Sequence, residues 1–235
     1  MKKLLKKYCD DIDIIITEKQ LSQFELYYEY LLEKNKVMNL TAITEKKDIV
    51  LKHFIDSIYI LKCTSLSGKK IMDVGTGAGF PGIPLSIMES DAHFVLLDSL
   101  NKRICFLEEV CKICKLDHVT AIHSRAEDAA RNENYREKFD IVVSRAVANM
   151  STLLEYCSPF VKVGGQFISY KSGQVDDELI AAKNAEQLLN MEYKESVDLL
   201  LPDMDIKRKL IKYEKMRILT KKFPRQAGKP KKEPL

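Results

Sequence analysis

Ile71-Met-Asp-Val-Gly-Thr-Gly-Ala-Gly-Phe-Pro-Gly82 is the stretch of sequence that decides the fold. It begins as a short apolar run, typical of a buried strand, and continues as a glycine-rich turn that leads into an apolar helical pattern. In open sheets of this kind, ligands bind beyond the carboxyl ends of the strands. Glycines allow positive φ angles and a close approach of the backbone to a ligand. We therefore predict that this turn is the floor of a ligand site.

Short apolar runs and helical patterns alternate from Lys70 onward. We predict strands at 70–74, 93–97, 119–122, 140–143, 165–170, 192–200 and 209–215, with helices at 83–88, 100–115, 126–131, 152–160 and 177–189. This alternation predicts an α/β fold of the Rossmann-like type, in which helices cover both faces of a doubly wound and mostly parallel sheet. Residues 67–220 would form this domain.

The first 66 residues predict a helical extension in front of that domain. Thr17-Glu-Lys-Gln20 fits a capping box, and apolar residues follow at helical spacing as far as Leu31. The helix should end near Asn39. A second apolar helix is expected at about 49–61.

The ligand of the glycine-rich turn has two candidates. Residues 77–82 match the G-x-G-x-x-G pattern, which favours a dinucleotide and a nicotinamide-dependent oxidoreductase. A pyrophosphate, however, needs free backbone N–H groups at the start of the helix, and Pro81 and Pro84 lack them. The glycines also begin directly after the strand, at Gly75, as in motif I of Rossmann-like methyltransferases. In that case Asp73 would lie below the methionine end of S-adenosylmethionine.

Two acidic residues follow the next two strands. Asp98 lies where the hydroxyls of a ribose are bound in such folds, although Asp98 or Ser99 could equally cap the following helix. Glu127 lies in the loop that surrounds the adenine in methyltransferases. Its alternative role is a capping box with Ser124, because the two have the required spacing.

The end of the fourth strand, Ser144-Arg145-Ala146, should lie beside the reacting groups. An Asn/Asp-Pro-Pro-Tyr/Phe motif, typical of enzymes that methylate exocyclic amines, is absent there. Carbon methylation would need a nucleophilic cysteine, but the nearest, Cys157, lies within a predicted helix. The remaining acceptors are a ring nitrogen or an oxygen. Arg145 could bind a substrate phosphate or carboxylate, or pair with a neighbouring acid.

Composition predicts a folded cytoplasmic protein. The 235 residues are 46% hydrophobic, and no apolar run of about 18 residues suggests a membrane span. The six cysteines should be reduced. Cys111, Cys114, His118 and His123 loosely resemble a zinc site, but the cysteines fit the buried stripe of a helix, and we expect no bound metal.

The sequence ends in a basic segment, KKFPRQAGKPKKEPL, at residues 221–235. It contains six basic residues, three prolines and one acidic residue, although the net charge of the whole chain is only +4. Such a composition predicts an extended or mobile tail that packs into no core. The tail is either a solvated terminus or an arm that binds phosphates.

Taken together, these segments resemble the 16S ribosomal RNA guanine-N7 methyltransferases of the RsmG, or glucose-inhibited division protein B, type. The resemblance covers nearly the whole chain. It is carried by seven segments in order: Asn39-Leu-Thr41-Ala-Ile, His53-Phe-Ile-Asp56-Ser57, Asp73 to Gly82, Asp98-Ser-Leu-Asn-Lys-Arg103, Arg125-Ala-Glu127, Ser144-Arg-Ala-Val147 and Phe223-Pro-Arg-Gln-Ala-Gly-Lys-Pro230.

The resemblance implies a seven-stranded sheet with a reversed last strand, and S-adenosylmethionine as cofactor. The implied cofactor contacts are Gly75, Gly77, Phe80, Asp98, Ser99, Leu100, Ala126, Glu127 and Arg145. The implied substrate is a guanosine in the 530 loop of 16S ribosomal RNA, as naked RNA or in the small ribosomal subunit. The RNA contacts would include Lys221, Lys222, Arg225 and Lys229.

Guanine N7 has an in-plane lone pair and no proton, so the implied reaction needs no general base. The enzyme would act as a monomer that holds the reactants in line. His53 and Asp56 are the residues to test if a base is required after all. The alternatives are the nicotinamide-dependent oxidoreductase and a non-catalytic ribosome-binding protein that retains a cofactor pocket.

Overall fold

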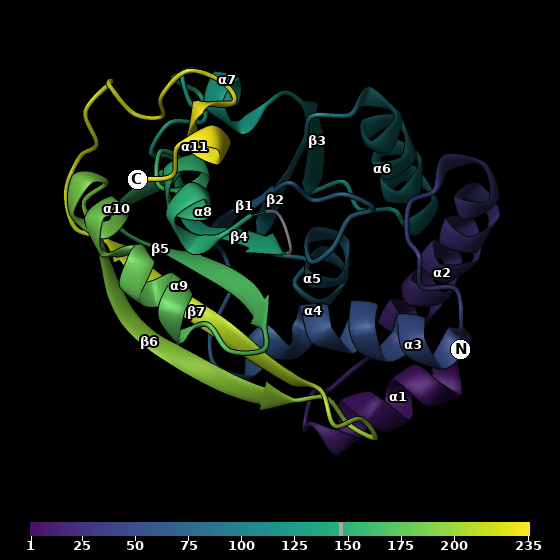
Figure 1. Ribbon diagram of the computed structural model, residues 1–235. Helices are drawn as coiled ribbons and strands as arrows, with labels where there is room; N and C mark the ends of the chain where they lie inside the picture. Colours follow the sequence, from purple (N-terminus) through teal and green to yellow (C-terminus); the bar gives the residue numbers. More distant parts are fainter. Residues whose placement is uncertain (146–147) are drawn as a thin grey trace.

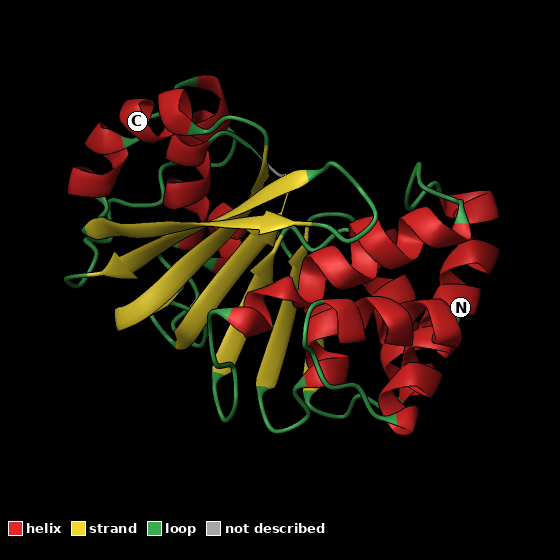
Figure 2. Cartoon of the chain, turned by 90° about the horizontal axis from the view of Figure 1, so that it is seen from below, coloured by secondary structure: helices red, strands yellow, loops and turns green. Residues whose placement is uncertain are grey.

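A central sheet separates two groups of helices in the computed structural model, which describes residues 1–145 and 148–235 (Figure 1). Ala146 and Val147, which end the 144–147 motif, lie outside the described residues. Viewed along the sheet, the N-terminal helices lie on one side and the helices near the C-terminus on the other (Figure 2). Within the described residues, no helix combines the length and apolar character needed to span a membrane.

Seven strands form the sheet in the order β3-β2-β1-β4-β5-β7-β6. Neighbouring strands from β3 through β5 pair in parallel, and β7 is antiparallel to β5 and β6. The predicted sheet, including its reversed last strand, is confirmed. The strands are β1 (Lys70–Val74), β2 (His93–Asp98), β3 (Val119–His123), β4 (Phe139–Arg145), β5 (Val161–Ser172), β6 (Met191–Leu200) and β7 (Lys207–Lys215). The strand order reverses between β1 and β4, where ligands bind in such sheets.

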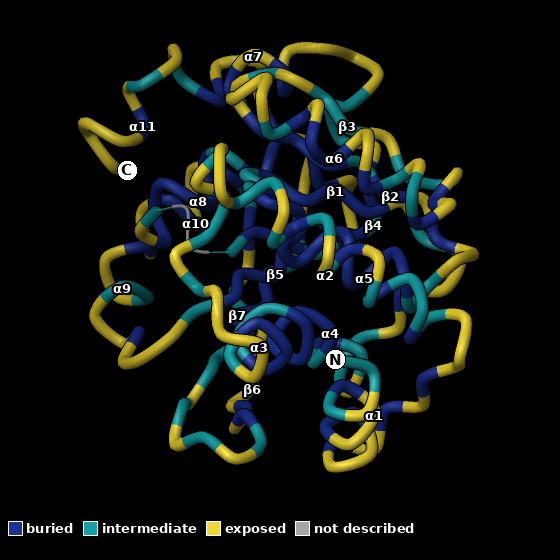
Figure 3. The backbone as a smooth tube through the Cα atoms, turned by 90° about the vertical axis from the view of Figure 1, so that its right-hand side faces the viewer, coloured by how far each residue is buried: buried dark blue, intermediate teal, exposed yellow. Residues whose placement is uncertain are grey.

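Each strand points successive side chains to opposite faces of the sheet. Asp73 of β1 is paired in register with Val143 of β4, and the alternation places Arg145 on the same face as these two. Buried apolar residues occupy both faces, and Figure 3 shows the buried backbone concentrated in the sheet and the helices against it. Arg145 therefore points to the face that the N-terminal helices cover.

The helices divide between these two faces. The first face carries α1 (Lys2–Asp11), α2 (Glu18–Met38), α3 (Lys46–Asp48), η1 (Ile49–Ile55), α4 (Asp56–Ile58), η2 (Tyr59–Lys62), α5 (Gly82–Met88) and α6 (Asn101–Cys114). The second face carries α7 (Ala126–Ala129), α8 (Met150–Cys157), α9 (Asp176–Ala181), α10 (Lys183–Leu188) and α11 (Lys229–Lys232). The capping box of Thr17 and Gln20 is formed at the start of α2, and a left-handed Asn39 ends that helix, both as predicted.

Two predicted helices differ from the structure. The helix expected at 177–189 is two short helices, α9 and α10. The helix expected at 49–61 begins earlier, at Lys46, and contains the π-helical segment η1. A π-helical segment is wider than an α-helix and is frequent at functional sites. Here it carries His53, which lines the site described below, and Lys52, whose carbonyl accepts a hydrogen bond from Arg145.

The expectation of a mobile tail is wrong for the middle of the C-terminal segment. Phe223, Pro224 and Pro230 are buried, and the segment passes over α8 towards α7 (Figure 1). Arg131 and Arg136 bind its backbone by donating hydrogen bonds to carbonyls of Leu219, Thr220, Phe223 and Pro224 at 2.9–3.1 Å. Composition failed as a guide because these anchors come from other parts of the chain.

Candidate functional site

The glycine-rich turn after β1 is held from below by Asp73. The Asp73 carboxylate accepts hydrogen bonds from Thr76 Oγ1 at 2.7 Å and from the Gly82 amide at 2.8 Å. Burial raises the pKa of Asp73 to about 6. Gly75 and Gly77 have φ angles of 74° and 62°, which L side chains rarely adopt. The turn is thus a fixed loop that presents bare backbone to the space above it.

Asp98, at the end of β2, ties the same turn to the neighbouring strand. Its carboxylate accepts hydrogen bonds from the amides of Leu100 and Gly77, both at 2.9 Å, and from Arg103 at 3.1 Å. No side chain caps α6, so the capping role that was the alternative for Asp98 or Ser99 is not formed, and the Asp98 carboxylate instead holds the amide of Leu100 directly before the helix. A carboxylate has about four acceptor positions, so one remains for a ligand hydroxyl.

Glu127 does not form the capping box that its spacing from Ser124 suggests. No side chain caps α7. The Glu127 carboxylate is buried and instead accepts a hydrogen bond at 2.8 Å from the amide of Gly228, 101 residues further along the chain. Of the two roles left open for Glu127, the local one is excluded.

These groups line a cavity of about 900 Å³ at the switch point of the sheet. All nine expected cofactor contacts lie on its wall, from Gly75 to Arg145. Other lining residues come from three further parts of the chain: Leu40, Thr41 and His53 from the N-terminal extension, Ala148 and Tyr156 near or in α8, and Gly228 and Lys231 from the C-terminal segment.

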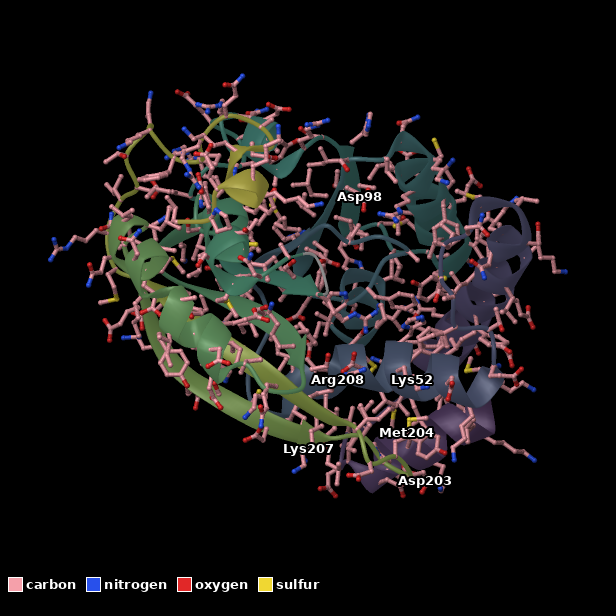
Figure 4. The ribbon with its side chains drawn as sticks, in the orientation of Figure 1. Lys52, Asp98, Asp203, Met204, Lys207 and Arg208 are labelled. Atoms are coloured by element: carbon pink, nitrogen blue, oxygen red, sulfur yellow. The ribbon has the colours of Figure 1, made fainter. Side chains whose placement is uncertain are left out.

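Arg145, at the end of β4, lines the cavity and belongs to an ionic cluster. Asp56, which is 3% exposed, pairs with Arg145 at 2.9 Å and with Arg208 of β7 at 3.1 Å. Arg145 also donates to the Lys52 carbonyl at 3.1 Å, and its guanidinium lies 5.1 Å from the centre of the Phe80 ring. In the view of Figure 4, Lys52 and Arg208 lie below Asp98. The cluster fixes Arg145 from several sides.

His53 is held neutral beside this cluster. Its ring stacks on Phe80 with 4.4 Å between ring centroids, and its Nε2 is 2.8 Å from Thr41 Oγ1. Burial, aided by the positive charge of Arg145, lowers the pKa of His53 to about 3. Such a weakly basic imidazole is a poor proton acceptor at neutral pH. Asp56 is fully engaged by two arginines, so neither candidate base is suited to that role.

The four residues of the loose zinc pattern are separately engaged. Burial raises the pKa of the Cys111 and Cys114 thiols to about 12, which disfavours the thiolate that zinc requires. His118 and His123 lie within hydrogen-bond distance of the carbonyls of Ser86 and Ser99. Among the residues that the structure describes, no group of three potential ligands is arranged for a metal ion.

The four expected RNA contacts differ in their surroundings. Lys221, Lys222 and Lys229 are exposed. Arg225 is half-buried, and its guanidinium is held by Glu155. The structure thus uses Arg225 as an anchor of its own segment.

Sequence reasoning missed Arg208, Tyr156, Gly228 and Lys231. The motif around Asn39 was noticed, but nothing in it indicated that Thr41 faces the cavity. Arg208 lies on a strand of alternating residues with no local signal of function. Gly228 and Lys231 belong to the basic segment, which was expected to be extended or mobile.

Comparison with known proteins matches this chain to a known family. A family model described as rRNA small subunit methyltransferase G matches residues 20–208. A protein of Lachnoclostridium phytofermentans named Ribosomal RNA small subunit methyltransferase G is 50% identical over 94% of this chain and 91% of its own. A protein of the same name from Alkaliphilus oremlandii is 48% identical over 100% of this chain and 99% of its own.

Solved structures resemble the fold at much lower identity. TYW2 of M. jannaschii, in complex with AdoMet, has a TM-score of 0.55 at 15% identity and covers 69% of this chain and 76% of its own. The YcgJ protein of Bacillus subtilis has a TM-score of 0.55 at 12% identity and covers 70% of this chain and 100% of its own. These likenesses support the class I methyltransferase architecture of the sheet.

Proposed function

The chain belongs to the rRNA small subunit methyltransferase G family, and from this premise we propose that it transfers a methyl group from S-adenosylmethionine to N7 of a guanosine in the 530 loop of 16S ribosomal RNA. Methylation of small-subunit ribosomal RNA is the activity of the family. The base, its ring position and the contacting residues are the proposed part.

The cavity fits S-adenosylmethionine better than a dinucleotide. The Gly77 amide donates to Asp98 and the Gly82 amide donates to Asp73, so two amides of the turn already face carboxylates. A pyrophosphate would meet negative charge there instead of free N–H groups. A Cβ added to Gly77 would meet no atom within 4 Å, so the space above this residue is open for a ligand without phosphate. These contacts count against the nicotinamide-dependent oxidoreductase.

The single observation that supports the N7 assignment is that the candidate bases and the candidate nucleophile named from the sequence are unsuited to those roles. His53 has its pKa lowered to about 3, and Asp56 is bound by Arg145 and Arg208. Cys157 is fully buried in α8, and burial raises its pKa well above the usual value. Exocyclic amines and hydroxyls must lose a proton on methylation, whereas guanine N7 does not.

The chain's contribution is then positioning. S-adenosylmethionine supplies an electrophilic methyl group when bound. The glycine turn, Phe80, Asp98 and Glu127 would hold it, while Arg145 and His53 would orient the guanosine beside it. Correct alignment of two reactants can lower a barrier by about 7–11 kcal/mol. Arg145 suits this role because Asp56 and the Lys52 carbonyl prevent it from turning away.

The RNA partner is supported by exposed cations on the C-terminal segment, which reaches the cavity. Lys221, Lys222 and Lys229 are exposed on the C-terminal segment, and Lys231 of the same segment lines the cavity. Such residues contact phosphates without reading sequence. We propose that the protein works as a monomer on 16S ribosomal RNA within the small subunit or an assembly intermediate.

The test is methyl transfer from radiolabelled S-adenosylmethionine to small ribosomal subunits that lack the modification, followed by identification of the modified nucleoside. We expect 7-methylguanosine at one position of the 530 loop, and much slower transfer by Arg145→Ala. A different modified base would refute the N7 assignment alone. Cofactor binding without any transfer would favour the non-catalytic ribosome-binding protein.

Single-turnover transfer should also be nearly independent of pH from about 6 to 9, because no group has to accept a proton. The measurement is the rate with saturating cofactor and subunits across this range. An acidic limb that moves on replacement of His53 or Asp56 would identify a base and point to an oxygen or amine acceptor.

A further inference from the structure

The C-terminal segment is fastened to the domain by a buried ion pair. Arg225 donates to both carboxylate oxygens of Glu155 at 2.6–3.0 Å, and its amide donates to the same carboxylate at 2.8 Å. The Glu155 side chain is 0% exposed, and that of Arg225 is 17% exposed. A buried bidentate arginine–carboxylate pair has a fixed geometry, unlike a surface ion pair.

Two further contacts carry the segment from this anchor to the cavity. Thr152 of α8 donates a hydrogen bond at 3.0 Å to the carbonyl of Pro230, which is buried. Gly228 lies between the two anchors, with a φ angle of 83°, and its amide donates to Glu127. The short helix α11 packs on α8 (Figure 1). Because both sides of Gly228 are fixed, this residue has a defined place on the cavity wall.

The contact between Gly228 and Glu127 joins the segment to the expected adenine loop. Glu127 is 6% exposed and lines the cavity, and so do Gly228 and Lys231. One Glu127 oxygen accepts the Gly228 amide, which leaves acceptor positions on the carboxylate for a ligand. The orientation of Glu127 therefore depends on the position of Gly228.

We propose that residues 223–231 form the adenosine-side wall of the cofactor site, and that Arg225 and Glu155 are positioning residues for cofactor binding. Neither of the two lines the cavity. They act through Gly228, which orients Glu127, and through the wall that Gly228 and Lys231 complete. This inference rests on the proposed function, because it takes S-adenosylmethionine as the occupant of the cavity.

Docking of this segment would couple cofactor binding to RNA binding. The segment that walls the cofactor also carries the exposed lysines Lys221, Lys222 and Lys229. Coupling free energies are reciprocal, so a segment that raises cofactor affinity when docked must itself be held more firmly by bound cofactor. Bound cofactor would then present these lysines to RNA in one arrangement.

The first test compares two double variants by calorimetry with S-adenosylhomocysteine. Glu155→Gln with Arg225→Met removes the ion pair without leaving a buried charge, and it should lower affinity about tenfold. The matched control, Lys232→Gln with Glu233→Gln, also removes one cation and one anion, both of them in the C-terminal segment. Both residues are exposed and outside the cavity wall, so the control should bind as the unmodified protein does.

Arg225→Lys should bind with intermediate affinity, because lysine keeps the charge and loses the two-pronged geometry. Equal affinity of the ion-pair variant and the unmodified protein would overturn the proposal. If the unmodified protein bound no S-adenosylhomocysteine, the proposed function would fail as well, and the two failures are thus distinguishable.

The second test uses the unmodified chain and so does not depend on the folding of a variant. Saturating S-adenosylhomocysteine should slow tryptic cleavage after Arg225 and Lys231 by about tenfold, the reciprocal of its effect on affinity. Cleavage after Lys112, which is exposed on α6 away from the cavity, should be unchanged. Equal cleavage after Arg225 and Lys231 with and without the ligand would contradict the proposal.

Discussion

The two ends of the chain reach the same cavity from opposite sides, and they are held in place by different forces. The N-terminal extension contributes Leu40, Thr41 and His53 to the wall, and the C-terminal segment contributes Gly228 and Lys231. Both lie outside the α/β unit that begins at β1. Each is therefore an addition to a common sheet that completes a site the sheet alone would leave open.

The N-terminal extension is attached by apolar packing. Phe24 and Leu31 of α2 are fully buried, and Phe24 lies 5.0 Å from the ring centre of Phe54 in η1. The C-terminal segment buries few apolar side chains and is attached by hydrogen bonds to its backbone and by the pair of Arg225 with Glu155. The first kind of attachment is visible as periodicity in the sequence. The second depends on single partners far away in the chain.

Loss of one aromatic ring should have the largest effect on stability and will show how far the N-terminal attachment is apolar. Phe24→Ala should lower the free energy of unfolding by about 3–5 kcal/mol, because it removes a fully buried ring and leaves a cavity. Urea titration measures this change. Val37→Ala on the same helix is the control, since Val37 is 78% exposed and should change stability by less than about 0.5 kcal/mol. A loss below about 1 kcal/mol for Phe24→Ala would contradict apolar attachment.

A smaller and more local effect is expected where the C-terminal segment begins. Arg136 donates hydrogen bonds to the carbonyls of Leu219, Thr220 and Phe223 at 3.0–3.1 Å. Arg136→Met should lower the free energy of unfolding by about 1–3 kcal/mol, because these carbonyls lose their charged donor. The loss should appear as faster hydrogen exchange of the Gly228 amide, with little change for β1. Arg217→Met removes an exposed charge nearby and should leave this exchange unchanged.

The sheet, the glycine turn and α2 could be predicted because their signals are local. Apolar runs separated by turn residues fixed all seven strands to within a few residues, and the capping box fixed the start of α2 at Thr17. The nine cofactor contacts, which the family resemblance implied, lie in short motifs at strand ends. Strand ends meet at one edge of a parallel sheet, and this brings such motifs together even when they are far apart in sequence.

The contacts that the sequence did not reveal join distant segments. Arg208 lies at the start of β7, just before the strand expected at 209–215, and only the pairing of β7 with β5 brings it to Asp56. Glu127 had a good local explanation in Ser124, yet its partner is Gly228. A polar group has many possible partners along a chain, whereas apolar periodicity requires only that one face be buried. The composition of the basic segment therefore suggested mobility where three-dimensional contacts impose order.

His53 distinguishes the N-terminal wall of the cavity, because it is a titratable side chain that the extension adds to this wall. Its pKa in the folded protein is about 3, against an ordinary value of 6.5, mainly because of burial. Above pH 6.5 both the folded and the unfolded chain carry a neutral imidazole. As the pH falls below 6.5, the unfolded chain binds a proton that folded His53 does not accept, so the stability contributed by this residue is lost progressively towards pH 3.

His53→Gln should therefore change stability little at pH 7.5, the smallest effect expected here, because glutamine can still hydrogen-bond Thr41. At lower pH its stability should fall less steeply than that of the unmodified protein, since the variant lacks the group whose protonation favours unfolding. Urea titrations of both proteins at several pH values between about 4 and 7.5 measure the difference between the two curves. Parallel curves would mean that His53 titrates with an ordinary pKa and is open to water. In that case it would be a plausible proton acceptor, and the N-terminal extension would contribute chemistry to the site in addition to its apolar wall.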